Sequence, residues 1–175
     1  MEPAAPAPSV VESVRGNEAL FQHDREPAKL GEVELCMNLL RCTRADLLNV
    51  VTGLPDELLD WDPPYASFAA WARWRTVREV LTHVALTEVG YYLPAIGYAG
   101  PGARELAPLH WTEQLRLSRE STLAFLAELA DADDRLRLAE GDESWSVRKV
   151  LRRLVWHELL HLKSVRRVMG AFRER

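Results

Sequence analysis

The sequence predicts an all-α protein built as a four-helix bundle. Apolar residues recur at helical spacing over four long stretches, and no run alternates apolar and polar residues between hairpin turns. Predicted helices of about 18–26 residues are typical of such a bundle. The 175 residues suffice for one domain with a hydrophobic core. We expect a single bundle domain over residues 18–175, preceded by a disordered segment rich in Pro and Ala over residues 1–17.

The first predicted helix runs from Leu30 to Val51. Gly53 and Pro55 end it, because glycine readily adopts the left-handed conformation after a last turn and proline cannot continue a helix. A long connection then leads to the second helix. The apolar stripe of the first helix consists of Leu35, Leu39, Leu40, Leu47 and Val51.

The second predicted helix begins at Thr76 and ends at Pro94. Thr76 and Glu79 have the spacing of a capping box, in which each side chain binds the backbone N–H of the other residue. The helix therefore has a defined start. Its predicted apolar stripe consists of Val77, Val80, Leu81, Val84 and Tyr91.

The third predicted helix, 112–130, follows a loop rich in Gly and Pro over 95–109. Its stripe consists of Leu115, Thr122, Phe125, Leu126 and Leu129. An acidic connection, 131–143, leads to the fourth helix, from Ser146 to Ala171. The stripe of that helix consists of Val147, Val150, Leu151, Leu154, Val165, Val168 and Met169. Its opposite, solvated face is predicted from Arg148, Arg152, Lys163, Arg166 and Arg167.

An internal repeat relates the starts of the second and fourth helices. Residues 74–81 (WRTVREVL) resemble residues 145–151 (WSVRKVL) once Arg75 is skipped. In that register Glu88 aligns with Glu158. Because helices with matching faces often pack around a common axis, we hypothesise that these two helices form such a pair.

The fourth helix carries the pattern His157-Glu158-Leu159-Leu160-His161. Histidines four residues apart lie about 40° apart around a helix and one turn apart along it, so both can reach one ion. Glu158 and His161 fall within the apolar stripe, and His157 lies at its edge. Polar groups aimed into a core need partners, which a metal ion provides. The alternative, two histidines on a solvated face, conflicts with the basic residues already there.

The HExxH pattern by itself suggests a zinc protease with Glu158 as general base. The extended metzincin pattern requires glycine and histidine where this chain has Ser164 and Arg167. A downstream glutamate ligand is available only as Glu174. The β-sheet against which such proteases pack their active-site helix is also not predicted, so the sequence argues against a protease.

His83 is the candidate for the third ligand that an open catalytic site requires. It lies at the edge of the stripe of the second helix, as His157 does on the fourth. The alternative is a lone histidine that is satisfied within the core. His23 and His110 are predicted to lie at the surface.

These motifs resemble the DinB-like superfamily of metal-binding four-helix-bundle proteins. The residues that carry the resemblance are 76–83 (TVREVLTH), 145–151 (WSVRKVL) and 157–161 (HELLH), and the likeness covers about residues 30–170. The resemblance implies an up-down-down-up bundle with long connections and a divalent ion, zinc or nickel, held by three histidines. His83, His157 and His161 match the ligand positions. Characterised members include thiol-dependent S-transferases and an isomerase, so it also implies a small-molecule substrate with a low-molecular-weight thiol among the candidates.

A site of three histidines leaves a position open for water, thiolate or substrate. Glu158 is the candidate catalytic residue: it either moves a proton or hydrogen-bonds a ligand histidine and fixes its tautomer. Glu88 is a candidate for the second of these roles. We expect a metal-dependent enzyme of the S-transferase or hydrolase type, and the alternative is a non-catalytic metal-binding or stress-response protein with a structural ion. Spacing alone does not select among transition metals.

The composition restricts the kinds of partner and the cellular compartment that we expect for this protein. A net charge of −4 argues against a nucleic-acid binder. Cys36 and Cys42 are too few for a disulfide framework and are expected to be buried apolar residues in a reducing compartment. No stretch approaches the roughly 20 apolar residues that cross a membrane, and the first residues lack the features of a secretory signal. We expect a cytoplasmic protein.

Two groups of aromatic and aliphatic residues suggest surfaces. Trp156, Leu159 and Leu160 lie on the basic face of the fourth helix, where we expect the N-terminal segment or a second subunit of a homodimer to cover them. Phe68, Trp71 and Trp74 approach the second helix, where they line a substrate pocket or, alternatively, form part of the core.

Overall fold

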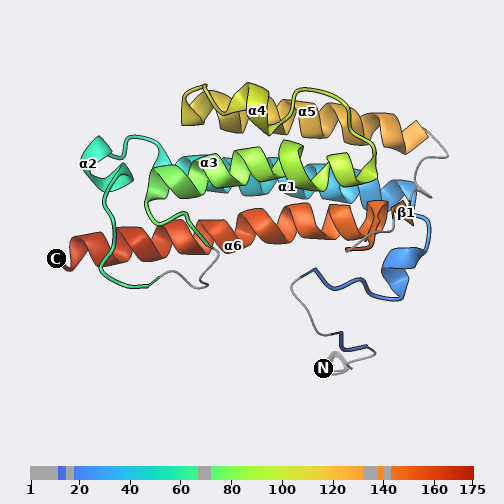
Figure 1. Cartoon of the computed structure of the whole chain (residues 1–175), viewed down its shortest axis with the longest axis horizontal. Coiled ribbons are helices and arrows are strands. Elements are labelled where there is room, and N and C mark those ends of the chain that lie inside the picture. Colours follow the sequence, from blue (N-terminus) through green and yellow to red (C-terminus); the bar gives the residue numbers. More distant parts are fainter. Residues whose placement is uncertain (1–11, 15–17, 67–71, 132–137, 140–142) are drawn as a thin grey trace, which may run out of the picture.

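The computed structural model describes residues 12–14, 18–66, 72–131, 138–139 and 143–175, and these are predominantly helical (Figure 1). In chain order the helical elements are η1 (His23–Arg25), α1 (Leu30–Val51), α2 (Asp56–Leu59), α3 (Val77–Thr87), η2 (Glu88–Tyr92), η3 (Pro94–Ile96), α4 (Ala103–Leu106), α5 (Trp111–Asp131) and α6 (Val147–Arg173). Two-residue strands, β1 (Leu138–Ala139) and β2 (Trp145–Ser146), form one antiparallel pair. The all-α prediction is confirmed.

Local sequence signals set the ends of the long helices. The capping box of α3 is present, because Thr76 Oγ1 accepts a hydrogen bond from the Glu79 N–H and Glu79 accepts one from the Thr76 N–H. The Ser146 hydroxyl accepts a hydrogen bond from the Lys149 N–H at the start of α6. Gly53, two residues beyond α1, has φ 78°, a conformation that side chains with a Cβ rarely adopt.

The four longest helices of the described chain lie side by side in Figure 1. Helix α1 packs against α5 and α6, and α3 packs against the same two helices. Apolar side chains fill the space between them in two clusters, one around Leu40, Leu126 and Val150 and the other around Leu47, Leu81 and Val165. Because α3 and α6 are in contact, the side chains predicted to bind metal face one another across a single gap.

The predicted apolar stripe of the second helix is wrong near its end, because the helix contains a π-helical turn there. The Leu93 N–H donates to the Glu88 carbonyl, five residues earlier, at 3.0 Å. This wider turn accommodates one extra residue and shifts the following side chains around the helix axis. Tyr92 is therefore buried, whereas Tyr91, predicted as a core residue, is 41% exposed. Helical structure also continues past Pro94 as η3, and α4 lies within the predicted loop 95–109.

The core prediction is also wrong at Leu35, Leu39 and Arg148. Leu35 is 59% and Leu39 41% exposed. Arg148, predicted to be solvated, is buried because its guanidinium donates to the backbone carbonyls of His23 and Pro27 and to the Glu32 carboxylate. Residues that precede α1 thus cover one side of α6.

Trp156 and Leu159, which we expected to be covered, are 44% and 41% exposed. The described residues before α1 do not cover them, and a homodimer that does so remains a prediction. Most of the segment predicted to be disordered, 1–11 and 15–17, lies outside the described residues.

Two further observations bear on the compositional expectations. No helix among the described residues is long and apolar enough to cross a membrane. Neither cysteine is in a disulfide, but only Cys36 is buried, and Cys42, expected to be buried, is exposed.

Candidate metal centre

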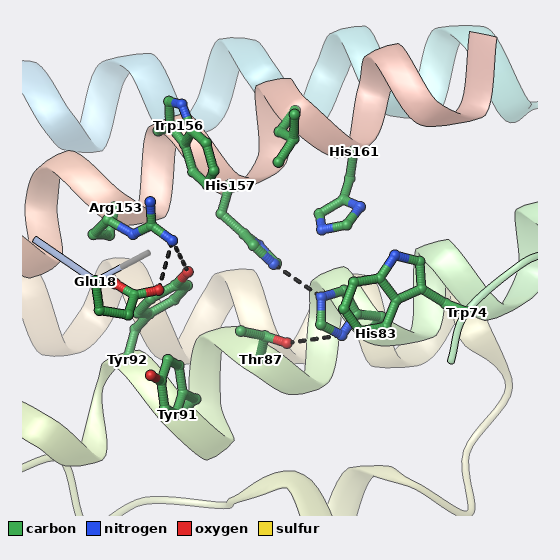
Figure 2. A pocket seen from close by; sticks show the side chains of 11 residues that line it. Glu18, Trp74, His83, Thr87, Tyr91, Tyr92, Arg153, Trp156, His157 and His161 are labelled. Carbon is green, nitrogen blue, oxygen red and sulfur yellow. Dashed lines mark hydrogen bonds and ion pairs between the residues drawn. The ribbon is translucent and has the colours of Figure 1, made fainter. Parts of the chain in front are cut away.

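Three histidines converge in the gap between α3 and α6 (Figure 2). His83 comes from α3, and His157 and His161 come from successive turns of α6. One potential ligand atom of each ring lies within 4.8 Å of the other two, and Nε2 of His83 is 3.1 Å from Nε2 of His157. Two nitrogen ligands on a tetrahedral ion would lie about 3.3 Å apart. The three residues could therefore hold a metal ion.

Burial keeps these three imidazoles neutral. It lowers the pKa of His83 to about 4, that of His157 to about 2 and that of His161 to about 3, and neighbouring histidines contribute to the last two shifts. Neutral imidazole is the form that binds metal. His161 Nδ1 is buried without a hydrogen-bond partner among the described residues. Buried polar atoms normally have partners, so this donor set suits an ion.

Neighbouring side chains orient His83. Its Nδ1 is hydrogen-bonded to the Thr87 hydroxyl at 3.2 Å, which leaves Nε2 directed toward His157. The Trp74 ring stacks on the His83 ring with centroids 3.5 Å apart and planes 12° apart. Trp74 thus lies at the site, in agreement with the hypothesis that it lines a substrate pocket. Phe68 and Trp71, which were part of the same hypothesis, lie outside the described residues.

The histidines form one end of a cavity of about 340 Å³. A volume of roughly 300–1,000 Å³ is typical of small-molecule sites. Aromatic side chains make up much of the wall, and Arg153 and Glu18 lie toward the other end (Figure 2). The lining consists of Glu18, Trp74, His83, Thr87, Tyr91, Tyr92, Arg153, Trp156, His157, Leu160 and His161.

The sequence-based prediction missed Glu18, Thr87, Tyr92 and Arg153. The internal repeat held a signal for two of them: its register, which aligns Glu88 with Glu158, also aligns Thr87 with His157 and His83 with Arg153. Corresponding positions on α3 and α6 thus line the same cavity. Glu18 had no such signal because it precedes the helices.

Glu158, the candidate catalytic residue, lies in a buried network of charges. Its carboxylate accepts hydrogen bonds from Arg44 at 2.5 Å and Arg119 at 2.8 Å, and from the Thr43 hydroxyl. Among the described residues, no hydrogen bond joins it to His83, His157 or His161. Its predicted roles, in proton transfer or in orienting a ligand histidine, remain predictions.

Glu88 shares both arginines with Glu158. Arg44 Nη2 donates to Glu88 at 2.8 Å, and Arg119 donates to the same oxygen. Two carboxylates and two guanidinium groups therefore balance in charge within the core. Burial would by itself raise the pKa of Glu158, but Arg44 and Arg119 outweigh this effect and lower it. We call Arg44, Glu88, Arg119 and Glu158 the buried quartet.

The remaining histidines take no part in the centre. His23 and His110 are both exposed, as predicted.

The pKa values of the three histidines predict how stability depends on pH without metal. The unfolded chain protonates these side chains near pH 6.5, whereas the folded protein keeps them neutral down to about pH 4. The unfolded state therefore binds more protons between these values, and the free energy of unfolding should fall as the pH drops below about 6.5. Urea denaturation of chelator-treated protein at about pH 7.5 and pH 5.5 measures this dependence. His161→Leu should reduce the dependence, and an unchanged dependence would contradict the assignment.

The family comparison agrees with this geometry. Residues 39–165, more than half of the chain, match the family model of the DinB superfamily. Searches of curated proteins and of solved structures found no match. The matched region includes all three histidines and all four residues of the buried quartet. The chain belongs to the DinB superfamily.

Proposed function

We propose that this protein binds one divalent transition metal through His83, His157 and His161 and acts as a metal-dependent enzyme on a small molecule. One observation carries the proposal: three neutral imidazoles converge at the end of a cavity of about 340 Å³. A purely structural site is normally closed by a fourth protein ligand, whereas a catalytic site keeps a position open. The described chain offers no fourth His, Cys, Asp or Glu within this group.

The residues around the centre support this reading. Thr87 holds His83 by its Nδ1, and Trp74 covers one face of that ring. Tyr92 packs edge-on against His157 with ring centroids 5.4 Å apart. These contacts fix the ring directions and keep water from the apolar sides of the site. A bound ion, with zinc and nickel our expected candidates, would supply Lewis-acid chemistry to a substrate group that reaches it.

The reaction we propose is of the S-transferase or hydrolase type, with a low-molecular-weight thiol as a candidate substrate. A soft thiolate is a good ligand for these metals, and the cavity reaches the centre directly. The second candidate function is a non-catalytic protein with a structural ion. The unpartnered Nδ1 of His161 does not distinguish the two functions, because an ion bound at that atom would satisfy it in either case.

For Glu158 we favour a structural role over proton transfer. Both carboxylate oxygens accept hydrogen bonds from arginine side chains, so the group is held as a charged acceptor. Glu158 directly follows His157 and would anchor α6 so that its histidines keep their direction. We favour a structural role for Glu88 as well, because one of its carboxylate oxygens accepts from Arg44 and Arg119 and the other accepts from the Thr122 hydroxyl at 3.2 Å.

We also infer that α1, α3, α5 and α6 form a four-helix bundle with up-down-down-up topology. The contacts of α1 and α3 with both α5 and α6 support this arrangement. The cytoplasmic location and the homodimer remain proposals.

A thiol titration of cobalt-substituted protein tests for an open position. We expect 2-mercaptoethanol to produce a sulfur-to-cobalt charge-transfer absorption that saturates with thiol. His110→Ala, which removes an exposed histidine outside the centre, should keep the absorption. Stoichiometric cobalt without any response to thiol or azide would favour the structural ion and contradict the enzyme.

A further inference from the structure

The cavity has a second polar end, distinct from the histidines. The side chains of Arg153 and Glu18 form an ion pair there, at 2.6 Å, and are only 8% and 7% exposed. Arg153 also donates to the Tyr92 hydroxyl at 3.4 Å, and its guanidinium lies 4.1 Å from the Trp156 ring centroid. Arginine is thus held by an aromatic surface and directed at a carboxylate within a small-molecule cavity (Figure 2).

The contact between Glu18 and Arg153 is incomplete. Glu18 Oε2 and Arg153 Nε are both buried without a hydrogen-bond partner among the described residues. Arginine frequently donates two parallel hydrogen bonds to a carboxylate, whereas Arg153 donates only one to Glu18 among the described residues, at 2.6 Å. Burial raises the pKa of Glu18 despite the nearby Arg153 and Lys149. A ligand carboxylate that binds Arg153 through both oxygens would be the better partner.

The Glu18 side chain can move away from Arg153 while the backbone around it stays attached to α6. Lys149 Nζ donates to the Glu18 backbone carbonyl at 2.8 Å, and Arg152 donates to the Ala19 carbonyl at 3.0 Å. Arg152 also binds the Asp24 carboxylate at 2.5 Å. The backbone is therefore attached to α6 independently of Arg153.

Resting on the function proposed above, we propose that Arg153 and Tyr92 form a subsite for a carboxylate group of the substrate, and that Glu18 occupies this subsite when no substrate is bound. Arg153 precedes His157 by four residues on α6, so the two lie about 6 Å apart along the helix axis. The substrate would be a small carboxylate whose apolar body crosses the aromatic wall of the cavity and whose reacting group lies at the histidines.

Calorimetric titration with matched ligands tests the subsite. The probes are 3-phenylpropionate and its neutral amide, 3-phenylpropanamide, added to chelator-treated and to zinc-loaded protein. We expect the wild type to prefer the carboxylate. Arg153→Gln should lose that preference, a change of about tenfold or more, while amide binding persists and shows that the cavity is intact.

Glu18→Gln should strengthen carboxylate binding, because it removes the competing charge, and should leave amide binding unchanged. Glu26→Gln is the matched control: it removes one negative charge from the same segment, at an exposed side chain outside the cavity lining, and should change neither affinity. The proposal is overturned if Arg153→Gln keeps the preference, or if Glu18→Gln does not strengthen carboxylate binding. Carboxylate binding to chelator-treated protein tests the Arg153 subsite without any metal. If the proposed metal centre is wrong, the protein will instead fail to bind zinc, so the two failures can be distinguished.

Discussion

Replacing His83 with alanine should remove tight metal binding. His83 is the ligand supplied by α3, and its Nε2 lies 3.1 Å from that of His157. Without His83, only two ligands, His157 and His161, remain, and both lie on one helix. The affinity for the metal should therefore fall by more than about a hundredfold, which exceeds the effect of losing a residue that only orients a ligand. Elemental analysis after dialysis should show about one ion per chain in the wild type and little in His83→Ala. The wild type should also gain thermal stability on adding zinc, and the variant should not.

Two matched variants make this result specific. Thr87→Val removes the hydroxyl that binds His83 Nδ1 but keeps all three ligands, so it should weaken binding by about 10- to 100-fold. His110→Ala, at an exposed position, should behave as the wild type. Full metal occupancy and unchanged affinity in His83→Ala would show that the three-histidine centre is wrong.

Glu158→Gln should destabilise the protein by about 3–5 kcal/mol, because it leaves buried arginine charge without its partner. The Glu158 side chain is 1% and the Arg44 side chain 7% exposed, so water does not compensate the loss. Urea denaturation of the metal-free variant measures the effect. Metal binding should survive under conditions in which the variant is folded, since no hydrogen bond joins Glu158 to the three histidines in the described chain.

A double variant separates charge balance from other effects. Arg119→Met should destabilise the protein by a similar amount, whereas the double variant Arg119→Met/Glu158→Gln leaves Arg44 and Glu88 as a neutral pair and should lose less than the sum. Arg116→Ala removes an exposed arginine from the same helix and should leave stability near that of the wild type. Normal stability of Glu158→Gln together with lost turnover would instead support its predicted role in catalysis.

The sequence predicted more of the metal centre than of the residues around it. The HExxH spacing and the apolar stripe placed His157 and His161 together, since both features lie within one helix. His83 needed the repeat as well, because its approach depends on how α3 packs against α6. Arg44 and Arg119 were missed, although each lies among apolar residues of a predicted stripe, near Leu40 and Leu115. A charge at such a position signals a buried partner, but the sequence does not identify which one.

What the sequence determined by itself was local: the all-α class, the bounds of α1, the caps at Thr76 and Ser146, and the histidine pair on α6. These features depend on spacing within one helix, so a single stretch of chain specifies them. Only the tertiary structure decided that Tyr92 replaces Tyr91 in the core, that Glu88 and Glu158 share two arginines, and that Glu18 reaches Arg153. Each of these depends on contacts between side chains far apart in sequence, or on a change of helical register, which periodicity alone does not encode.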